Sequence, residues 1–145
     1  MANYRIPLKV GLPQEKLFTY LTTLSYARDW EPSVAGARDE NTAALGIGSS
    51  FDLEIRARKR TRPFTYKIVE FEPPQRAVLE AITRAFYSRI TINVLKIDDE
   101  TSEMNFESAL RRRGFSAIFN GILYFPMRRI GKRAHLNLER VLTGR

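Results

Sequence analysis

Apolar and polar residues alternate along most of the first 110 positions of the chain. A period of two is typical of a strand that buries one face. It predicts a first strand at Tyr4–Val10, and Pro7 indicates an edge strand or a local irregularity, because proline donates no ladder hydrogen bond. The polar, Gly-rich stretch from Ala35 to Ser50 leaves room for one short strand before Gly46. Five further strands are predicted at residues 51–57, 64–71, 76–83, 87–97 and 102–110.

Apolar residues spaced three and four apart predict three helical segments. The first covers Pro13–Thr23 and starts at Pro13, where a missing N–H costs no helical hydrogen bond. A second short helix or turn at Tyr26–Trp30 ends before Pro32. A long amphipathic helix closes the chain, and Pro126 either starts its regular part or kinks it. Its apolar stripe consists of Leu123, Met127, Ile130, Ala134, Leu138 and Val141.

The order of these elements is one strand, two short helices, about six strands and a long helix. Gaps of hairpin length between the strands leave no room for crossover helices, so the sheet is predicted to be antiparallel and the fold class to be α+β. The chain has 145 residues, of which 43% are hydrophobic. This length and composition predict a single domain over residues 1–145.

The chain contains no cysteine and a single histidine, His135. Disulfides, thiolate catalysis, iron–sulfur clusters and cysteine-ligated zinc are therefore excluded, as is a histidine-rich metal site. We expect no metal and no cofactor. His135 flanks the apolar stripe of the closing helix, which is typical of a residue at a helix boundary.

The net charge of +8 is concentrated in the last quarter of the chain. Residues 1–110 carry 15 basic and 15 acidic side chains, whereas residues 111–145 carry nine basic ones and a single acidic one, Glu139. This asymmetry indicates either a solvated helix face or an anionic partner such as a membrane surface, a nucleic acid or an acidic ligand. The predicted basic surface consists of Arg111, Arg112, Arg113, Arg128, Arg129, Lys132 and Arg133.

A second basic cluster, Arg56–Arg62, surrounds a predicted hairpin. It would form one positive patch with residues 111–113 if both lay on the same side of the molecule. The start of the chain lacks the apolar core of a secretory signal. The most apolar stretch, Phe115–Met127, is shorter than the ~18–20 residues that cross a bilayer, so we expect a cytoplasmic protein.

Three segments carry a family resemblance. Residues 12–21, LPQEKLFTYL, and the WEPSV turn at residues 30–34 form the first, and residues 66–76, YKIVEFEPPQR, form the second. The third, residues 46–51, enters a strand through Gly46 and Gly48, which we interpret as a tight turn because the lysine of a phosphate loop is absent. Together they resemble the SRPBCC superfamily, which includes START domains, pollen-allergen-like proteins and the polyketide cyclase/dehydrase-like family.

This resemblance covers essentially the whole chain and implies a helix-grip fold. In that fold a curved seven-stranded antiparallel sheet, with two short helices after its first strand, wraps around the C-terminal helix and encloses a hydrophobic cavity. The activity stays open, because the superfamily includes lipid carriers, cyclases, hydrolases, ribosome-associated factors and binding modules.

The inward-facing positions of the predicted strands are mostly apolar. They either line the cavity or pack as core, because pockets are built from the same residue types as cores. Ala81, Val94 and Met104 share this face, and Trp30 is either a structural plug or a wall of the cavity. The ligand-binding candidates are Phe18, Trp30, Leu53, Ile55, Tyr66, Ile68, Leu79, Ile90, Ile92, Phe106, Met127 and Ile130.

Few polar groups share this inward parity, and two of them are catalytic candidates. Tyr66 carries a hydroxyl that needs a partner when it is buried, and Ser108 lies on the face of Phe106. Glu70 lies an even number of residues from Tyr66 and is therefore expected on the same inward face. A carboxyl group in an apolar cavity has a raised pKa and can act as a general acid or base. A bulge near Val69 would instead turn Glu70 to solvent.

Three functions fit these features and stay open at this point, as do the oligomeric state and whether the chain is an enzyme. The first is binding or carriage of a small hydrophobic or amphipathic molecule, with an acidic head if the basic helix forms the rim of the cavity. The second is a cyclase or dehydratase acting on an aromatic or polyketide-like substrate, in which Tyr66 or Glu70 moves protons. The third is a basic module that docks on a ribosome, RNA or an anionic membrane.

Overall fold

The computed structural model describes residues 2–57, 60–114 and 127–144. Strands and helices follow one another in the order expected from the sequence. They are β1 (Ala2–Val10), α1 (Gln14–Thr22), the 3-10 helix η1 (Leu24–Asp29), β2 (Val34–Arg38), β3 (Ser50–Ala57), β4 (Arg60–Glu72), β5 (Arg76–Ile82), β6 (Phe86–Asp98), β7 (Thr101–Arg112) and α2 (Met127–Thr143).

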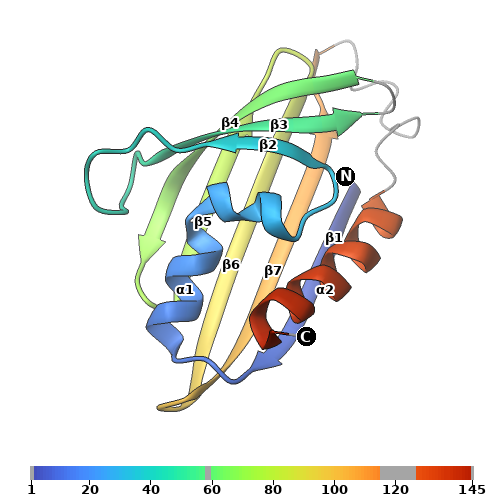
Figure 1. Ribbon diagram of the computed structural model, residues 1–145. Coiled ribbons are helices and arrows are strands. Elements are labelled where there is room, and N and C mark those ends of the chain that lie inside the picture. Colours follow the sequence, from blue (N-terminus) through green and yellow to red (C-terminus); the bar gives the residue numbers. More distant parts are fainter. Residues whose placement is uncertain (1, 58–59, 115–126, 145) are drawn as a thin grey trace.

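The seven strands form one antiparallel sheet in the order β1-β7-β6-β5-β4-β3-β2. The sheet is strongly curved, and α1, η1 and α2 all lie on its concave side (Figure 1). The last strand, β7, pairs with the first, β1. The C-terminal helix α2 packs mainly against β1. The α+β class and the helix-grip architecture expected from the sequence are confirmed.

Strand parity decides which side chains face the helices. The inward positions of the sheet are buried, as predicted, whereas their neighbours along each strand are mostly exposed or half-buried. Pro7 is exposed on β1, which is an edge strand paired only with β7, as the proline indicated. The buried inward set contains Leu53, Ile55, Tyr66, Ile68, Leu79, Ala81, Ile90, Ile92, Val94, Met104 and Phe106.

The short elements differ slightly from the expected positions. Helix α1 begins at Gln14, one residue after the predicted start, with Pro13 as its N-cap, and η1 begins at Leu24, two residues before the expected start. The short strand expected before Gly46 is β2, which lies at Val34–Arg38 and extends the sheet by pairing with β3. The tight turn expected at Gly46 and Gly48 is present, since Ser49 N–H donates to the Gly46 carbonyl and Gly48 has a positive φ.

The apolar stripe of α2 steps differently from the predicted one in its last turn. Ile130, Ala134 and Leu138 are buried, but Val141 is 41% exposed, so its assignment to the stripe is wrong. Steps of four residues continue to Leu142, which packs against the core instead. Met127 also packs against the core. Leu123 of the stripe and Pro126, the predicted start or kink of the helix, lie outside the described residues.

Helix α2 approaches β1 at Gly131. A Cβ atom built on Gly131 would lie 2.5 Å from the Cβ of Tyr4, closer than nonbonded carbons pack. A glycine at this position therefore allows the helix to lie directly against the strand. Within the described residues, neither helix has the length and apolar character needed to cross a bilayer.

Candidate functional site

A cavity of about 30 Å³ lies between the concave face of the sheet and α2. It has room for about one water molecule. Its apolar wall comes from β3, β4, β7 and α2 and consists of Ile55, Phe64, Leu110, Met127 and Ile130. Its polar wall comes from β1, β4, β6, β7 and the segment before β2 and consists of Tyr4, Glu31, Ser33, Tyr66, Ser88 and Ser108.

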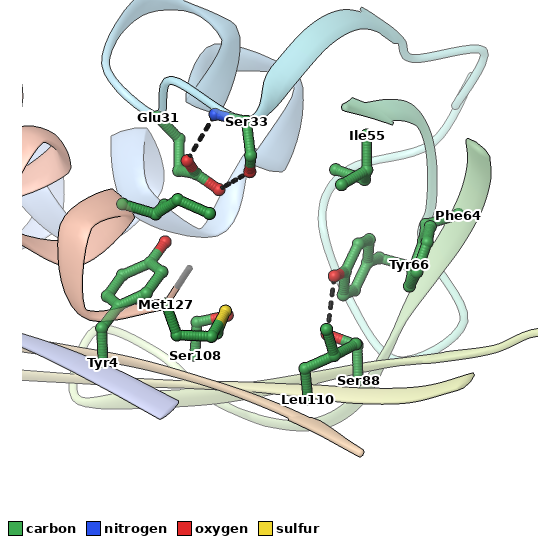
Figure 2. Close-up of a pocket in the computed structure, with 11 residues that line it drawn as sticks. Tyr4, Glu31, Ser33, Ile55, Phe64, Tyr66, Ser88, Ser108, Leu110 and Met127 are labelled. Atoms are coloured by element: carbon green, nitrogen blue, oxygen red, sulfur yellow. Dashed lines mark hydrogen bonds between the residues drawn. The ribbon is translucent and has the colours of Figure 1, made fainter. Parts of the chain in front are cut away.

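Among the described residues, Glu31 supplies the only carboxyl group in this wall, from the short segment between η1 and β2. Its Oε1 accepts a hydrogen bond from the Ser33 backbone N–H at 2.8 Å, and its Oε2 accepts one from the Ser33 hydroxyl at 2.5 Å. The hydroxyl of Tyr4 points toward the same carboxylate from β1 (Figure 2). Pro32 stiffens the intervening backbone, so the carboxyl group is held in one orientation.

Burial raises the pKa of Glu31 above its ordinary value of 4.5. Hydrogen bonds from Ser33 and Tyr4 lower the pKa again but offset only part of the effect of burial. No lysine or arginine of the described residues forms an ion pair with Glu31. The site therefore holds a carboxyl group that keeps its proton to a higher pH than an exposed one and can exchange it with a neighbouring group.

Tyr66 and Ser88 form the second polar pair of the cavity. Their hydroxyl oxygens lie 2.7 Å apart (Figure 2). The sheet register places Tyr66 opposite Ala81, and Ala81 opposite Ser88, so the pair spans the intervening strand β5 over the small side chain of Ala81. Burial raises the pKa of the Tyr66 hydroxyl far above neutrality, so Tyr66 acts as a neutral hydrogen-bonding group.

Comparison with known proteins identifies the fold. No family model and no curated protein sequence matches the chain. Solved structures do match over nearly the full length. A Deinococcus radiodurans protein matches with a TM-score of 0.65 and 13% identity, over 97% of this chain and 95% of that one. A START superfamily protein from Mycobacterium smegmatis matches with a TM-score of 0.62 and 10% identity, over 96% of this chain and 90% of that one. The Zhui aromatase/cyclase from a Streptomyces species also matches, with a TM-score of 0.61 and 12% identity, over 97% of this chain and 83% of that one. The chain has the START-like helix-grip fold.

Within this helix-grip fold, only part of the predicted ligand-binding set reaches the cavity. Ile55, Tyr66, Met127 and Ile130 line it. Phe18 lies at a separate surface hollow, beside Phe71. The other candidates are buried in the core without lining the cavity, and they are Trp30, Leu53, Ile68, Leu79, Ile90, Ile92 and Phe106.

Trp30 illustrates how these residues pack inside the protein. Its ring packs edge-on against Phe106 with centroids 4.8 Å apart, and its backbone carbonyl accepts a hydrogen bond from Asn137 of α2 at 3.1 Å. Trp30, the C-cap residue of η1, thus fills part of the concave face between β7 and α2. Trp30 is buried and does not line the cavity.

Glu70 does not line the cavity, contrary to its parity with Tyr66. The β4–β5 pairing shifts register between Ile68 and Glu70, and this bulge turns the Glu70 side chain outward. Its carboxylate lies 3.2 Å from Arg89 and 3.8 Å from Arg76 in an exposed cluster. The carboxyl group that lines the cavity is that of Glu31.

The sequence carried a signal for some residues that the site prediction missed. Glu31 and Ser33 belong to the WEPSV turn of the family resemblance, although nothing in that motif alone separates a functional acid from a structural one. Tyr4 and Phe64 occupy inward strand positions, as does Ser88 on β6. The nearest predicted polar residue, Ser108, does line the cavity.

The predicted basic residues lie in two places. Those of α2 are exposed: Arg128, Arg129, Lys132 and Arg133. At the end of β7, Arg111 stands over the ring of Tyr87, 4.6 Å from its centroid, on the outer face. Arg113 and Arg62, by contrast, line the same hollow of about 540 Å³, so one residue of each predicted basic cluster lies there. Arg58 and Lys59 of the hairpin cluster lie outside the described residues.

Proposed function

We propose that this protein binds a small, mostly hydrophobic molecule between the concave face of the sheet and α2, and that polar groups of the cavity recognise a hydrogen-bonding group on it. The observation that carries the proposal is the buried Glu31 carboxyl, which no cation of the described residues neutralises and whose neighbours include Tyr4 and the Tyr66–Ser88 pair. A buried acid of this kind is costly for stability and is typical of a functional site.

The size of the ligand requires a second space beside the cavity. Sites for small molecules usually measure about 300–1,000 Å³, whereas the cavity measures about 30 Å³. The hollow of about 540 Å³ shares the Phe64 side chain with the cavity. In our proposal the Phe64 ring moves aside when the ligand binds, so that the body of the ligand occupies the hollow and its polar end reaches Glu31 and Tyr66.

The fold supports this function at a coarse level. Its structural neighbours include a START superfamily protein and an aromatase/cyclase. Both names point to proteins that accommodate a small molecule, and we carry only that feature over to this chain.

The test uses N-phenyl-1-naphthylamine, an uncharged probe whose fluorescence rises in apolar surroundings. The wild type should enhance the fluorescence, and an Ile130→Phe variant, which fills the cavity from α2, should bind at least roughly tenfold more weakly. Leu136→Phe is the matched control, because it adds the same bulk to an exposed position of the same helix. A wild type that leaves the fluorescence unchanged, or equal binding by the Ile130 and Leu136 variants, contradicts the proposal.

The raised pKa of Glu31 favours a second candidate function, dehydration or cyclisation of a polyketide-like substrate. A protonated Glu31 can give its proton to a leaving hydroxyl, and the carboxylate then accepts a proton from the adjacent carbon, so that water is the only product lost. Glu31→Gln keeps the size of the side chain, and its amide can still accept from the Ser33 N–H through Oε1 and donate to the Ser33 hydroxyl oxygen through Nε2. It should therefore retain probe binding and abolish turnover of a poly-β-carbonyl substrate, and retained turnover contradicts this candidate.

A further inference from the structure

The hollow that shares Phe64 with the cavity is surrounded by arginine side chains. We call it the mouth hollow, and its lining includes Arg62, Arg84, Arg113, Phe64 and Phe86. These residues come from β4, from the β5–β6 turn, from the start of β6 and from the position directly after β7. Three positive charges thus lie around a floor of two aromatic rings.

The alternation of side chains along the strands places arginines on the same concave face as the residues that line the cavity. In β4, Arg62 occupies the face that Phe64 and Tyr66 occupy further along. In β7, Arg112 follows Ser108 and Leu110 on the same face. The concave surface therefore changes from apolar to cationic at its last row. The guanidinium carbons of Arg62 and Arg112 lie 5.7 Å and 5.6 Å from the centroid of the Phe86 ring.

Backbone hydrogen bonds hold the rim of the mouth hollow in place. The β5–β6 turn is closed by the Thr83 N–H, which donates to the Phe86 carbonyl at 2.9 Å. Arg113 fastens the end of β7 to this turn, because its N–H donates to the Ala85 carbonyl at 2.8 Å and its Nη1 donates to the Thr83 carbonyl at 2.5 Å. A guanidinium group has five donors, so Arg113 retains donors for a ligand after this contact.

The charge of the mouth hollow is not balanced by nearby acids. Within the described part of the chain, no acidic side chain lines it, and Arg62, Arg84 and Arg113 form no ion pair. On the outer face of the same sheet, by contrast, Arg76 and Arg89 share Glu70. Arginine donors around an apolar floor match a planar acid attached to an apolar body.

We propose that the mouth hollow binds the acidic group of the ligand, so that the ligand class is an amphipathic anion with a carboxylate, sulfonate or phosphate at its outer end. This inference rests on the proposed function and adds the charge and the orientation of the ligand. The acid lies among Arg62, Arg84 and Arg113 at the outer rim of the mouth hollow. The apolar body occupies the rest of the hollow, and the hydrogen-bonding end passes Phe64 to reach the cavity.

The experiment compares two probes that differ only by an acidic group, the uncharged N-phenyl-1-naphthylamine and its sulfonated counterpart 8-anilinonaphthalene-1-sulfonate. The wild type should bind the sulfonate more tightly, and added salt should weaken only the sulfonate. Arg62→Gln and Arg84→Gln, alone and combined, should weaken the sulfonate about tenfold in the double variant and leave the neutral probe within about twofold. Arg84 lies exposed in a turn, so its variant preserves the fold if that of Arg62 does not.

Arg111→Gln is the matched control, since it removes the same charge at the end of β7 from the outer face. Equal binding of both probes by the wild type, or equal losses in the Arg111 and Arg84 variants, overturns this inference while the proposed function stands. Failure of both probes to bind overturns both. Vesicles of phosphatidylcholine and phosphatidylserine form a further arm: if the double variant loses vesicle binding but keeps sulfonate binding, these arginines serve a membrane surface and the inference is wrong.

Discussion

The hydroxyl of Tyr66 and the hydroxyl of Ser88 lie 2.7 Å apart and connect β4 with β6 across the strand between them. The contact depends on Ala81, which occupies the same row of the sheet and is small enough to let the two side chains meet above it. One polar pair thus fixes the position of an aromatic ring in the cavity wall. It also leaves both hydroxyl groups within reach of a bound molecule.

Tyr66→Phe should destabilise the fold by about 1–2 kcal/mol, because it leaves the buried Ser88 hydroxyl without its partner. Ser88→Ala should cost a similar amount. The Tyr66→Phe/Ser88→Ala double variant should cost less than the sum of the single ones, because it removes the orphaned group as well. Urea unfolding of the four proteins measures this coupling, and strictly additive losses would show that the hydrogen bond contributes nothing.

Glu31→Gln should change how stability depends on pH. The pKa of Glu31 is higher in the folded protein than its ordinary value of 4.5. Between these two values the folded chain keeps a proton that the unfolded chain has lost, so the free energy of unfolding falls as pH rises. Each unit of difference in pKa corresponds to about 1.4 kcal/mol.

Glutamine does not titrate, so this loss should be absent from the variant. The difference in unfolding free energy between wild type and variant should therefore shift in favour of the variant as pH rises above 4.5 and level off above the folded pKa. Urea unfolding across this range measures the difference. Parallel profiles of the two proteins would contradict a raised pKa at Glu31.

Local periodicity predicted the parts of the molecule that local rules determine. Alternation placed Tyr66 and Phe106 on the buried face because side chains of a strand point alternately to its two sides. Pro7 marked the edge strand because it cannot donate to a second neighbour. These properties depend on a few consecutive residues, and a single sequence contains them.

The site itself depends on contacts between distant segments. Glu31 lies in an irregular segment, and its burial follows from the packing of η1 and α2 against β1, which no periodicity encodes. Strand parity alone put Glu70 on the inner face, and the bulge left open as the alternative is present between Ile68 and Glu70. Such a bulge reverses the face of the residues that follow it. The predicted apolar stripe of α2 included Val141 because the sequence alone does not show whether the buried face continues by a step of three residues or of four.

Gly131→Ala should destabilise the fold by about 1–3 kcal/mol, as overpacking does. The added methyl group would lie 2.5 Å from the Cβ of Tyr4, so α2 must move away from β1. Alanine favours a helix over glycine by about 1 kcal/mol, and a net loss therefore means that the clash outweighs this gain. Lys132→Ala, at the exposed neighbouring position, should stay within about 0.5 kcal/mol of the wild type. Thermal or urea unfolding decides, and a stabilised Gly131 variant would show that the helix can shift freely.

Phe64→Ala should lower stability and improve binding of the neutral probe at the same time. Phe64 is buried and forms the wall between the cavity and the mouth hollow, so truncation should cost about 3–5 kcal/mol. It also joins the two spaces without requiring the ring to move, which removes a cost of binding.

Phe71→Ala is the control on the same strand, because Phe71 lines a different hollow, and it should lower stability without improving binding. Urea unfolding and titration with N-phenyl-1-naphthylamine measure both quantities. If Phe64→Ala binds the probe no better than Phe71→Ala, the cavity and the mouth hollow do not form one ligand site.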